Sequence, residues 1–389
     1  MLALGVAAQA AGTLVVTAPA LLIPHLHAQG MPLAQAGLLA AAPTAGMVLT
    51  LIAWGAVTDR IGERIVIAGG LVLTTLAVAG AWLAGDDTVF LGVAFLAAGM
   101  TSASTNAASG RVVVGWFPKE RRGLAMGIRQ MSQPLGVTLA AVTVPRLAEA
   151  SGIRSALVLP VVLCAVLAVV CAVGIVDPPR PSRPATTTAA GDAGAAASTA
   201  NPYRATGFLW RIHAVSILLV VPQFTLSTYG LVWLVTLGWS TATAGLLVGV
   251  AQFVGAIGRI LVGFWSDRVG SRVGPLRVVA VSAAAVMAVL ALVDVAHLPA
   301  AAVVLVVATS VTVADNGLAY TSVAEAAGPS WSGRALGAQN TGQFIAASAV
   351  GPGIGALVGL VGFAGSFLLV AALPVLALPL VPRADRSHD

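Results

Sequence analysis

Long apolar runs separated by short polar loops dominate this chain. Most runs match the length of a helix that crosses the hydrocarbon layer of a membrane, about 20 residues. Only 9% of the 389 residues are charged and 58% are hydrophobic, whereas soluble domains are roughly 25% charged. A fold with so few ionisable groups cannot cover its surface in water, so a soluble enzyme is excluded.

The runs predict an all-α membrane protein with twelve transmembrane helices. The first run has no basic leader and no clear cleavage site, so we interpret it as a span and not as a signal peptide. The predicted helices cover residues 1–24, 33–58, 65–85, 88–115, 122–146, 153–176, 208–235, 241–265, 275–296, 298–326, 333–359 and 361–381.

One long hydrophilic segment divides the helices into two sets of six. Residues 177–207 are rich in Pro, Ala, Thr and Gly, a composition that cannot build a core and is typical of a flexible linker. We therefore expect an N-terminal six-helix bundle at 1–176, a C-terminal six-helix bundle at 208–382 and a short tail at 383–389.

The basic side chains predict how the chain is oriented. Of the 20 Lys and Arg residues, 15 lie in the loops after every second helix or in the tail, and only Arg146 and Arg154 lie in the opposite loops. The positive-inside rule then places both termini in the cytoplasm. We expect a monomeric multi-pass protein of the inner (cytoplasmic) membrane. The net charge of +6 is scattered between apolar runs, so nucleic acid is not an expected partner.

The two halves repeat each other in sequence. The segment from Gly55 to Arg64, GAVTDRIGER, matches the segment from Gly263 to Arg272, GFWSDRVGSR, at an offset of 208. A second set of matches has an offset of 210: Asn106, Gly123, Gly127 and Gln133 recur as Asn316, Gly333, Gly337 and Gln343. Such a duplication of six spans is one of the known ways to build a carrier with alternating access.

The repeated G-x-x-x-D-R-x-G-x-R loop resembles the signature of the major facilitator superfamily, and the resemblance covers essentially the whole chain. It implies two pseudo-symmetric six-helix bundles that rock around a central site. It also implies a cytoplasmic gate in which Asp59 lies near Gly333, and Asp267 near Gly123, at helix N-termini of the other half. The alternative is that the loop only anchors the topology. The predicted gate residues are Asp59, Arg60, Arg64, Asp267, Arg268 and Arg272, with Arg111 and Glu325 as a further pair.

Charged residues inside predicted spans are candidates for function because each costs roughly 2.5–3.5 kcal/mol to insert. Arg129 and Gln133 are four residues apart and share one helix face, as do Gln339 and Gln343 at the equivalent positions. Arg259 is a second buried guanidinium. An arginine can hold a carboxylate through two parallel hydrogen bonds. The alternative is that each arginine forms a structural pair with a neighbouring helix.

Arg259 also breaks the internal repeat, because its counterpart in the first half is Leu51. Some anion carriers of the superfamily are similar in having an arginine in the eighth helix that binds the substrate carboxylate. The resemblance therefore implies a substrate contact at Arg259. A packing role is the alternative, since many other members carry Gly-Arg at this position.

Asp315 is the one acid near the middle of a predicted span. A desolvated carboxylate can bind and release a proton near neutrality, so Asp315 is the candidate for proton coupling. A fixed salt bridge to an intramembrane arginine is the alternative. The remaining predicted cavity residues are polar, although such residues also serve as contacts between helices: Asn106, Asn316, Gln9, Gln223 and Tyr229. We expect His213 to be a solvated helix-end residue.

The sequence contains no phosphate-binding loop, no H-E-x-x-H, no G-x-S-x-G and no cysteine–histidine metal spacing. We therefore expect no enzyme activity, no cofactor and no metal, and we exclude ATP as the energy source. The leading hypothesis is a secondary transporter that moves a small organic anion, with protons, by alternating access. One alternative is a proton-driven multidrug efflux antiporter, but such antiporters carry a G-P-x-x-G-G-like motif, and the segment Gln133-Pro134-Leu135-Gly136 departs from it. The other alternative is a non-transporting transporter-like sensor.

Overall fold

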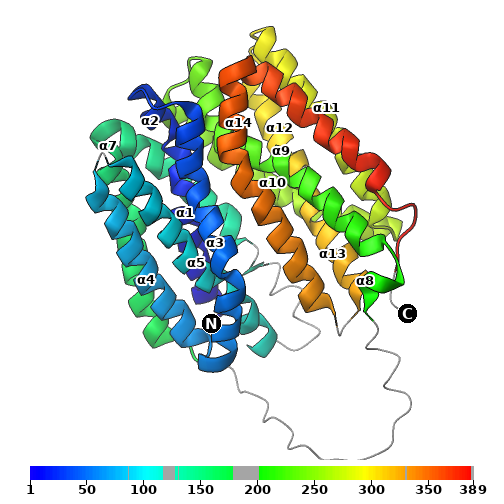
Figure 1. The fold of residues 1–389 in the computed structure, drawn as a ribbon, viewed down its shortest axis with the longest axis horizontal. Coiled ribbons are helices and arrows are strands. Elements are labelled where there is room, and N and C mark those ends of the chain that lie inside the picture. Colours follow the sequence, from blue (N-terminus) through cyan, green and yellow to red (C-terminus); the bar gives the residue numbers. More distant parts are fainter. Residues whose placement is uncertain (86, 117–127, 130, 178–200, 329–330, 387–389) are drawn as a thin grey trace, which may run out of the picture.

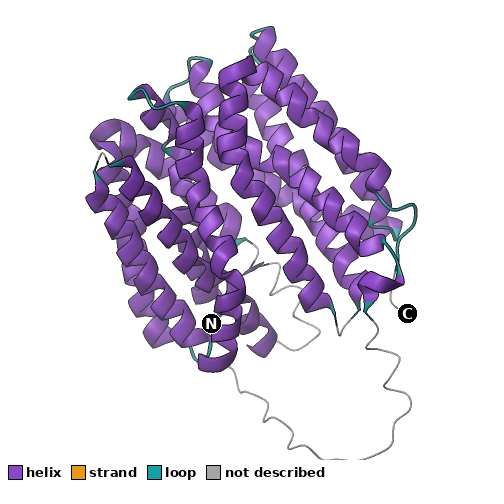
Figure 2. Cartoon of the chain, viewed as in Figure 1, coloured by secondary structure: helices purple, strands orange, loops and turns teal. Residues whose placement is uncertain are grey.

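The computed structural model describes residues 1–85, 87–116, 128–129, 131–177, 201–328 and 331–386, and these residues are helical, with no β-strand among them (Figure 2). The fold is a set of long helices that run roughly side by side (Figure 1). Ten of the helical stretches are long and apolar enough to cross a membrane. The prediction of an all-helical membrane protein is confirmed.

The first half of the chain, up to residue 177, forms one group of helices, coloured blue to green in Figure 1. Its helices are α1 (Leu2–Leu21), α2 (Ile23–Ala28), α3 (Leu33–Ile61), α4 (Glu63–Ala84), α5 (Thr88–Trp116) and α7 (Ser132–Gly174). The predicted span at 1–24 is thus interrupted at Leu22, and the chain continues as the short helix α2.

The second half, from residue 201, forms the other group, coloured green to red in Figure 1. Its elements are α8 (Pro202–Ala205), α9 (Phe208–Thr236), α10 (Thr241–Val269), α11 (Val273–Val295), α12 (Ala301–Thr312), α13 (Asp315–Ala327), α14 (Ser332–Ala377) and the 3-10 turn η3 (Leu378–Leu380). The predicted helix at 298–326 is broken at Val313 and Ala314, between α12 and α13.

Two of the long stretches turn back on themselves. α7 and α14 span 43 and 46 residues, which at 1.5 Å per residue is about twice the hydrocarbon thickness of roughly 30 Å. Each contains a glycine with positive φ, Gly152 at 78° and Gly362 at 72°, a conformation that glycine adopts without strain. The carboxylate of Asp294 accepts a hydrogen bond from the backbone N–H of Ala364 just after the second turn. Ten stretches therefore provide twelve crossing segments within the described residues.

The two halves meet at the end of the molecule away from the termini. The backbones of Gly37 in α3 and Gly351 in α14 lie so close that a Cβ on either would overlap the other. The hydroxyl of Tyr229 in α9 donates to the carbonyl oxygen of Gly351 and lies 3.4 Å from that of Leu33. Glycine permits such close approach of helices in a membrane.

A second contact between the halves joins α7 and α10. The hydroxyl of Thr138 donates to the carbonyl oxygen of Gly249 at 3.2 Å, and a Cβ on Gly245 would overlap the carbonyl of Ala141. The hydrogen bonds that join described residues of the two halves all belong to these two contacts. The described structure is therefore sealed toward the end away from the termini.

The glycine contact makes a testable prediction about conformation. We expect Gly37→Val to force α3 and α14 apart, because its side chain would overlap backbone and the Tyr229 hydroxyl. Gly353→Val on α14 is the matched control, since a Cβ there meets nothing within 4 Å. Spin labels on the exposed residues Glu149 and His297 would report the separation. Equal distance distributions in the two variants would contradict the assigned seal.

Candidate functional site

A polar cluster lies inside the first half, where α1 and α5 meet the chain just before α7. Arg129 donates from Nε to the Ser109 hydroxyl at 3.0 Å, and from one terminal nitrogen to the Asn106 backbone carbonyl at 3.0 Å and side-chain Oδ1 at 3.1 Å. Gln9 contacts both α5 residues, at 3.4 Å and 3.0 Å. Three predicted residues, Gln9, Asn106 and Arg129, thus lie together. Gln133 is half-buried on the adjoining turn.

A larger polar cluster lies inside the second half and is built from α9, α13 and α14. Asn316 donates to Gln223 at 2.8 Å, and Gln343 donates to Asn316 at 3.1 Å and to the Ser216 hydroxyl at 2.6 Å. Tyr320 donates to Gln343 at 3.0 Å. The structure brings together three residues that the sequence singled out, Gln223, Asn316 and Gln343.

The break between α12 and α13 places the two central charges of this half beside each other. The carbonyl of Val313, freed from the helix by the break, accepts a hydrogen bond from Nε of Arg259 at 3.1 Å. Asp315 begins α13, is 1% exposed, and both its carboxylate oxygens are without a hydrogen-bond partner among the described residues. The two side chains interact electrostatically but form no direct ion pair within 4 Å in the described structure.

The two arginines lie at similar depth in opposite halves. α7 and α10 run antiparallel, because Gly245 faces Ala141 while Gly249 faces Thr138. Arg129 lies nine residues before Thr138 and Arg259 ten residues after Gly249, so both lie on the terminal side of the α7–α10 contact.

Two further predicted residues lie apart from these clusters. Tyr229 is fully buried and takes part in the seal between the halves. Gln339 contacts His213, and the ring of His213 also contacts the hydroxyl of Tyr203 at 2.9 Å. The expectation of a solvated His213 is wrong, because the side chain is 8% exposed. Tyr203 lies in the predicted linker, whose last residues therefore pack on the second bundle.

The predicted gate is partly described. Arg272 pairs with Asp267 at the end of α10 and with Glu325 of α13, the latter at 3.2 Å. The expected pairing of Glu325 with Arg111 is not tested, because the side chain of Arg111 lies outside the described residues. The expected contacts of the two gate aspartates with the other half are not tested either, because the side chain of Asp59, Gly123 and the surroundings of Gly333 also lie outside them. Arg268 lies over the ring of Phe264, and Arg60 and Arg64 lie at the exposed end of α3 and the start of α4.

A pair of carboxylates that the sequence reading did not single out fixes these loops. Asp177 accepts a hydrogen bond from the backbone N–H of Arg64 at 2.7 Å, and Asp385 accepts from that of Arg272 at 2.8 Å. Asp177 and Asp385 are 208 positions apart, and so are Arg64 and Arg272. Continuing this offset past the loop motif, to the residues just after each bundle, would have found the two carboxylates.

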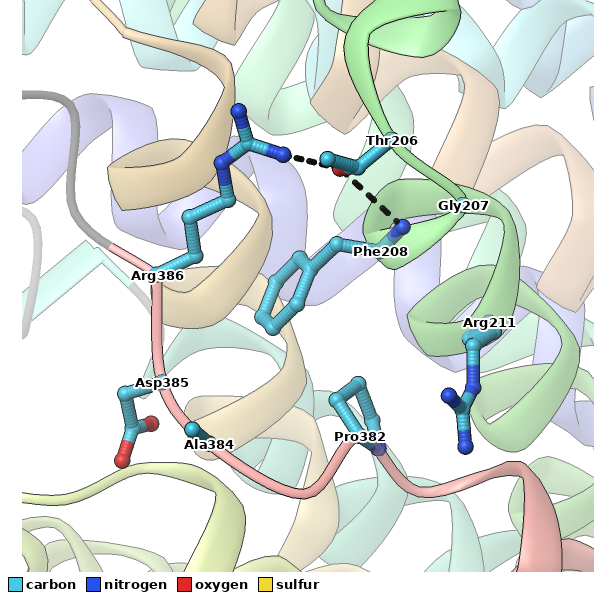
Figure 3. A pocket seen from close by; sticks show the side chains of 8 residues that line it. All are labelled: Thr206, Gly207, Phe208, Arg211, Pro382, Ala384, Asp385 and Arg386. Carbon is cyan, nitrogen blue, oxygen red and sulfur yellow. Dashed lines mark hydrogen bonds between the residues drawn. The ribbon is translucent and has the colours of Figure 1, made fainter.

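The segment that carries Asp385 also borders an open pocket of about 460 Å³ at the terminal end (Figure 3). Its walls include Phe208 and Arg211 of α9, and Arg386, which bonds the Thr206 hydroxyl. The guanidinium of Arg211 donates hydrogen bonds to the carbonyl oxygens of Pro379 and Leu380. This pocket is formed by elements of the second half alone and includes no predicted binding residue.

Two bundles of membrane-crossing helices, sealed together at one end and lined with polar clusters, define the class of multi-pass membrane transporters. A model of the Major Facilitator Superfamily matches residues 1–351. Uncharacterised MFS-type transporters of two Mycobacterium tuberculosis strains are 45% identical to this chain over 375 residues, which is 96% of the chain and 82% of each relative. The chain belongs to the Major Facilitator Superfamily, and it is a transporter and not an enzyme.

Solved structures agree on the fold. A bacterial homologue of the human lysosomal transporter Spinster, in an inward-facing and occupied conformation, superimposes with a TM-score of 0.78 at 16% identity, over 98% of this chain and 95% of that one. A D-xylose–proton symporter has the same TM-score of 0.78 at 14% identity, over 98% and 97%. At these identities the likeness shows the fold.

The hydrogen bonds that Asp385 accepts at the start of α11 lead to a prediction about pH. Burial alone would raise the pKa of Asp385, but hydrogen bonds from Ser271, Val273 and Arg272 outweigh it and hold the pKa below its ordinary value of 3.8. A lowered pKa means that the ionised carboxylate stabilises the fold above pH 3.8 and that this stabilisation is lost as the pH falls through the folded-state pKa.

We therefore expect Asp385→Asn to unfold at a lower temperature than the wild type at pH 7, with the gap narrowing as the pH falls below 3.8 and through the folded-state pKa. Arg383→Gln, an exposed neighbour in the same segment, is the control and should unfold like the wild type at pH 7. A gap that persists unchanged at acid pH would contradict the role of the charge.

Proposed function

We propose that this protein is a secondary active transporter that moves a small organic anion of the carboxylate type together with protons. The observation that carries the proposal is the buried carboxylate of Asp315, which lies beside Arg259 and has no side-chain hydrogen-bond partner among the described residues. Arg259 uses its Nε for Val313, and its two terminal nitrogens have no hydrogen-bond partner among the described residues. A guanidinium with a free edge can hold a carboxylate through both nitrogens.

The coupling follows from competition for Arg259. When Asp315 is ionised, its charge compensates Arg259 and opposes the approach of a second anion. When Asp315 is protonated, the positive charge of Arg259 is free to bind the substrate. A proton and an anion therefore bind together, which is symport. Arg129, held by Asn106 and Ser109 at a similar depth in the first half, is proposed as the second positive charge that faces the substrate.

The neutral cluster supplies hydrogen-bonding groups beside the charges. Gln223, Asn316 and Gln343 are linked in one chain of hydrogen bonds, and such a chain can exchange its internal bonds for bonds to a polar solute. Two guanidinium groups and one acid at the centre disfavour an organic cation, so multidrug efflux is the weaker candidate. The neighbouring fold of a D-xylose–proton symporter is compatible with proton coupling in this architecture.

The two bundles, 1–176 and 208–382, are proposed to rock about this site, joined by the linker at 177–207. The basic loops support a location in the cytoplasmic membrane with both termini in the cytoplasm. In that orientation the seal described above closes the outer side. The transporter is proposed to act as a monomer.

The anion proposal is tested by binding. We expect Arg259→Ala to weaken binding of the recognised carboxylate about ten- to a hundredfold, because a hydrogen bond to a charged group contributes about 1.5–3 kcal/mol. Thermal-shift titration of purified protein with a panel of carboxylates and organic cations measures this. Arg146→Ala, an exposed arginine near the far end of the first bundle, is the control. Normal binding of organic cations by both variants, with no carboxylate bound, would refute the proposal.

Proton coupling is tested by separating uptake from exchange. We expect Asp315→Asn to abolish uptake driven by a pH gradient in proteoliposomes while leaving exchange of substrate across the membrane intact, because the amide cannot release a proton. Asp87→Asn is the control, since Asp87 lies in a loop and caps α5 through the N–H groups of Val89 and Phe90. Unchanged pH dependence in Asp315→Asn would reject the coupling role.

A further inference from the structure

An apolar groove runs along the outer surface of the first bundle between α4 and the last part of α7. It has a volume of about 360 Å³ and almost wholly apolar walls. Val72 and Leu76 of α4 and Val169 of α7 are 49%, 63% and 65% exposed, so the groove opens toward the hydrocarbon of the membrane. Its lining residues are Ala68, Gly69, Val72, Thr75, Leu76, Ala165, Ala168, Val169 and Ala172.

The length and position of the groove match one leaflet of a bilayer. From Ala68 to Leu76 the α4 wall rises roughly 12 Å, a little under half of the hydrocarbon thickness of about 30 Å. The groove begins near the start of α4 and near the end of α7, which are both at the terminal end of the bundle. One mouth therefore lies at the membrane edge and the other near the midplane.

Arg64 lies at the edge mouth of this groove. Its Nε donates to the carbonyl oxygen of Ala172, a wall residue, at 2.6 Å. Its two terminal nitrogens have no hydrogen-bond partner among the described residues, and the side chain is exposed. The nearby carboxylate of Asp177 accepts from the backbone N–H of Arg64 and forms no ion pair with its guanidinium. The open edge of a guanidinium thus stands where an apolar slot meets the membrane surface.

The second bundle uses the same positions differently. Arg272, the counterpart of Arg64, is engaged by Asp267 and Glu325. The counterpart of Gly69 is Arg277, whose guanidinium donates to the carbonyl of Pro382 at 2.8 Å. The counterparts of Ala168 and Ala172, counted from the matched Asp177 and Asp385, are Leu376 and Leu380. In the second bundle the equivalent arginine is engaged by two carboxylates, and larger side chains occupy the positions of the small ones that open the groove.

We propose that this groove is a binding site for an anionic phospholipid, with one acyl chain in the apolar slot and the phosphate on Arg64. A guanidinium binds phosphate oxygens through two parallel hydrogen bonds, and basic pockets between transmembrane helices bind acidic lipid head groups. Charge complementarity selects the lipid over a second copy of this chain, because an apolar helix laid in the slot would bury the open edge of Arg64 without a partner.

The test measures retention of single lipids by the purified protein with native mass spectrometry, using phosphatidylglycerol and phosphatidylcholine. We expect the wild type to retain phosphatidylglycerol preferentially, and Arg64→Gln to bind it about tenfold more weakly and to lose the preference. Arg64→Lys should keep part of the preference, because lysine keeps the positive charge but cannot form two parallel hydrogen bonds to the phosphate. Arg204→Gln, which removes another exposed arginine at the same end, is the control and should behave like the wild type.

A second variant tests the slot. Ala165→Leu combined with Ala172→Leu fills the slot from two partly exposed wall residues, whose counterparts in the second bundle are Leu373 and Leu380. This variant should reduce retention of both lipids at this site without lowering the unfolding temperature. An unchanged preference in Arg64→Gln, or wild-type retention in the filled groove, would overturn the proposal. The outcome does not depend on the substrate, so it stands or falls apart from the proposed transport function.

Discussion

Hydrocarbon offers no partner to a polar group, so a polar side chain inside this molecule depends on the protein itself for hydrogen bonds. Small clusters that join several helices supply them for both buried arginines, whereas the carboxylate of Asp315 has no side-chain partner among the described residues. Arg129 is held by a hydroxyl, an amide and a backbone carbonyl of one neighbouring helix. Arg259 takes the carbonyl that a broken helix leaves unbonded. These same clusters are the proposed site of solute recognition, so the proposal makes stability and transport depend on the same hydrogen bonds.

The internal repeat is kept at the loops that begin the third helix of each half and is broken at the proposed binding site. Asp177 and Asp385 hold the backbone at the start of the third helix of each half, with the same offset of 208. At the centre the halves differ, because the counterpart of Arg259 in the first half is Leu51. A symmetric frame allows two bundles to rock against each other, whereas binding a single asymmetric solute requires different groups on the two sides.

The contacts between the halves suit the proposed rocking of the two bundles. Glycine and backbone carbonyls form the α3–α14 contact, and one hydroxyl, that of Tyr229, fastens it. No charge is buried in the seal within the described residues. A contact built from van der Waals packing and a few neutral hydrogen bonds holds the helices close together, and separating them requires little free energy.

The sequence determined the helical membrane fold, the twofold repeat, the loop signature and most members of the two polar clusters, because each follows from composition, period or offset along the chain. Tertiary structure alone decided the rest. His213 reads as a solvated helix end, yet the last residues of the linker and α14 cover it. Tyr229 reads as a cavity residue, yet it fastens two helices of different halves. The partners of these two residues in α3 and α14 are more than a hundred positions away along the chain, and no local pattern carries that information.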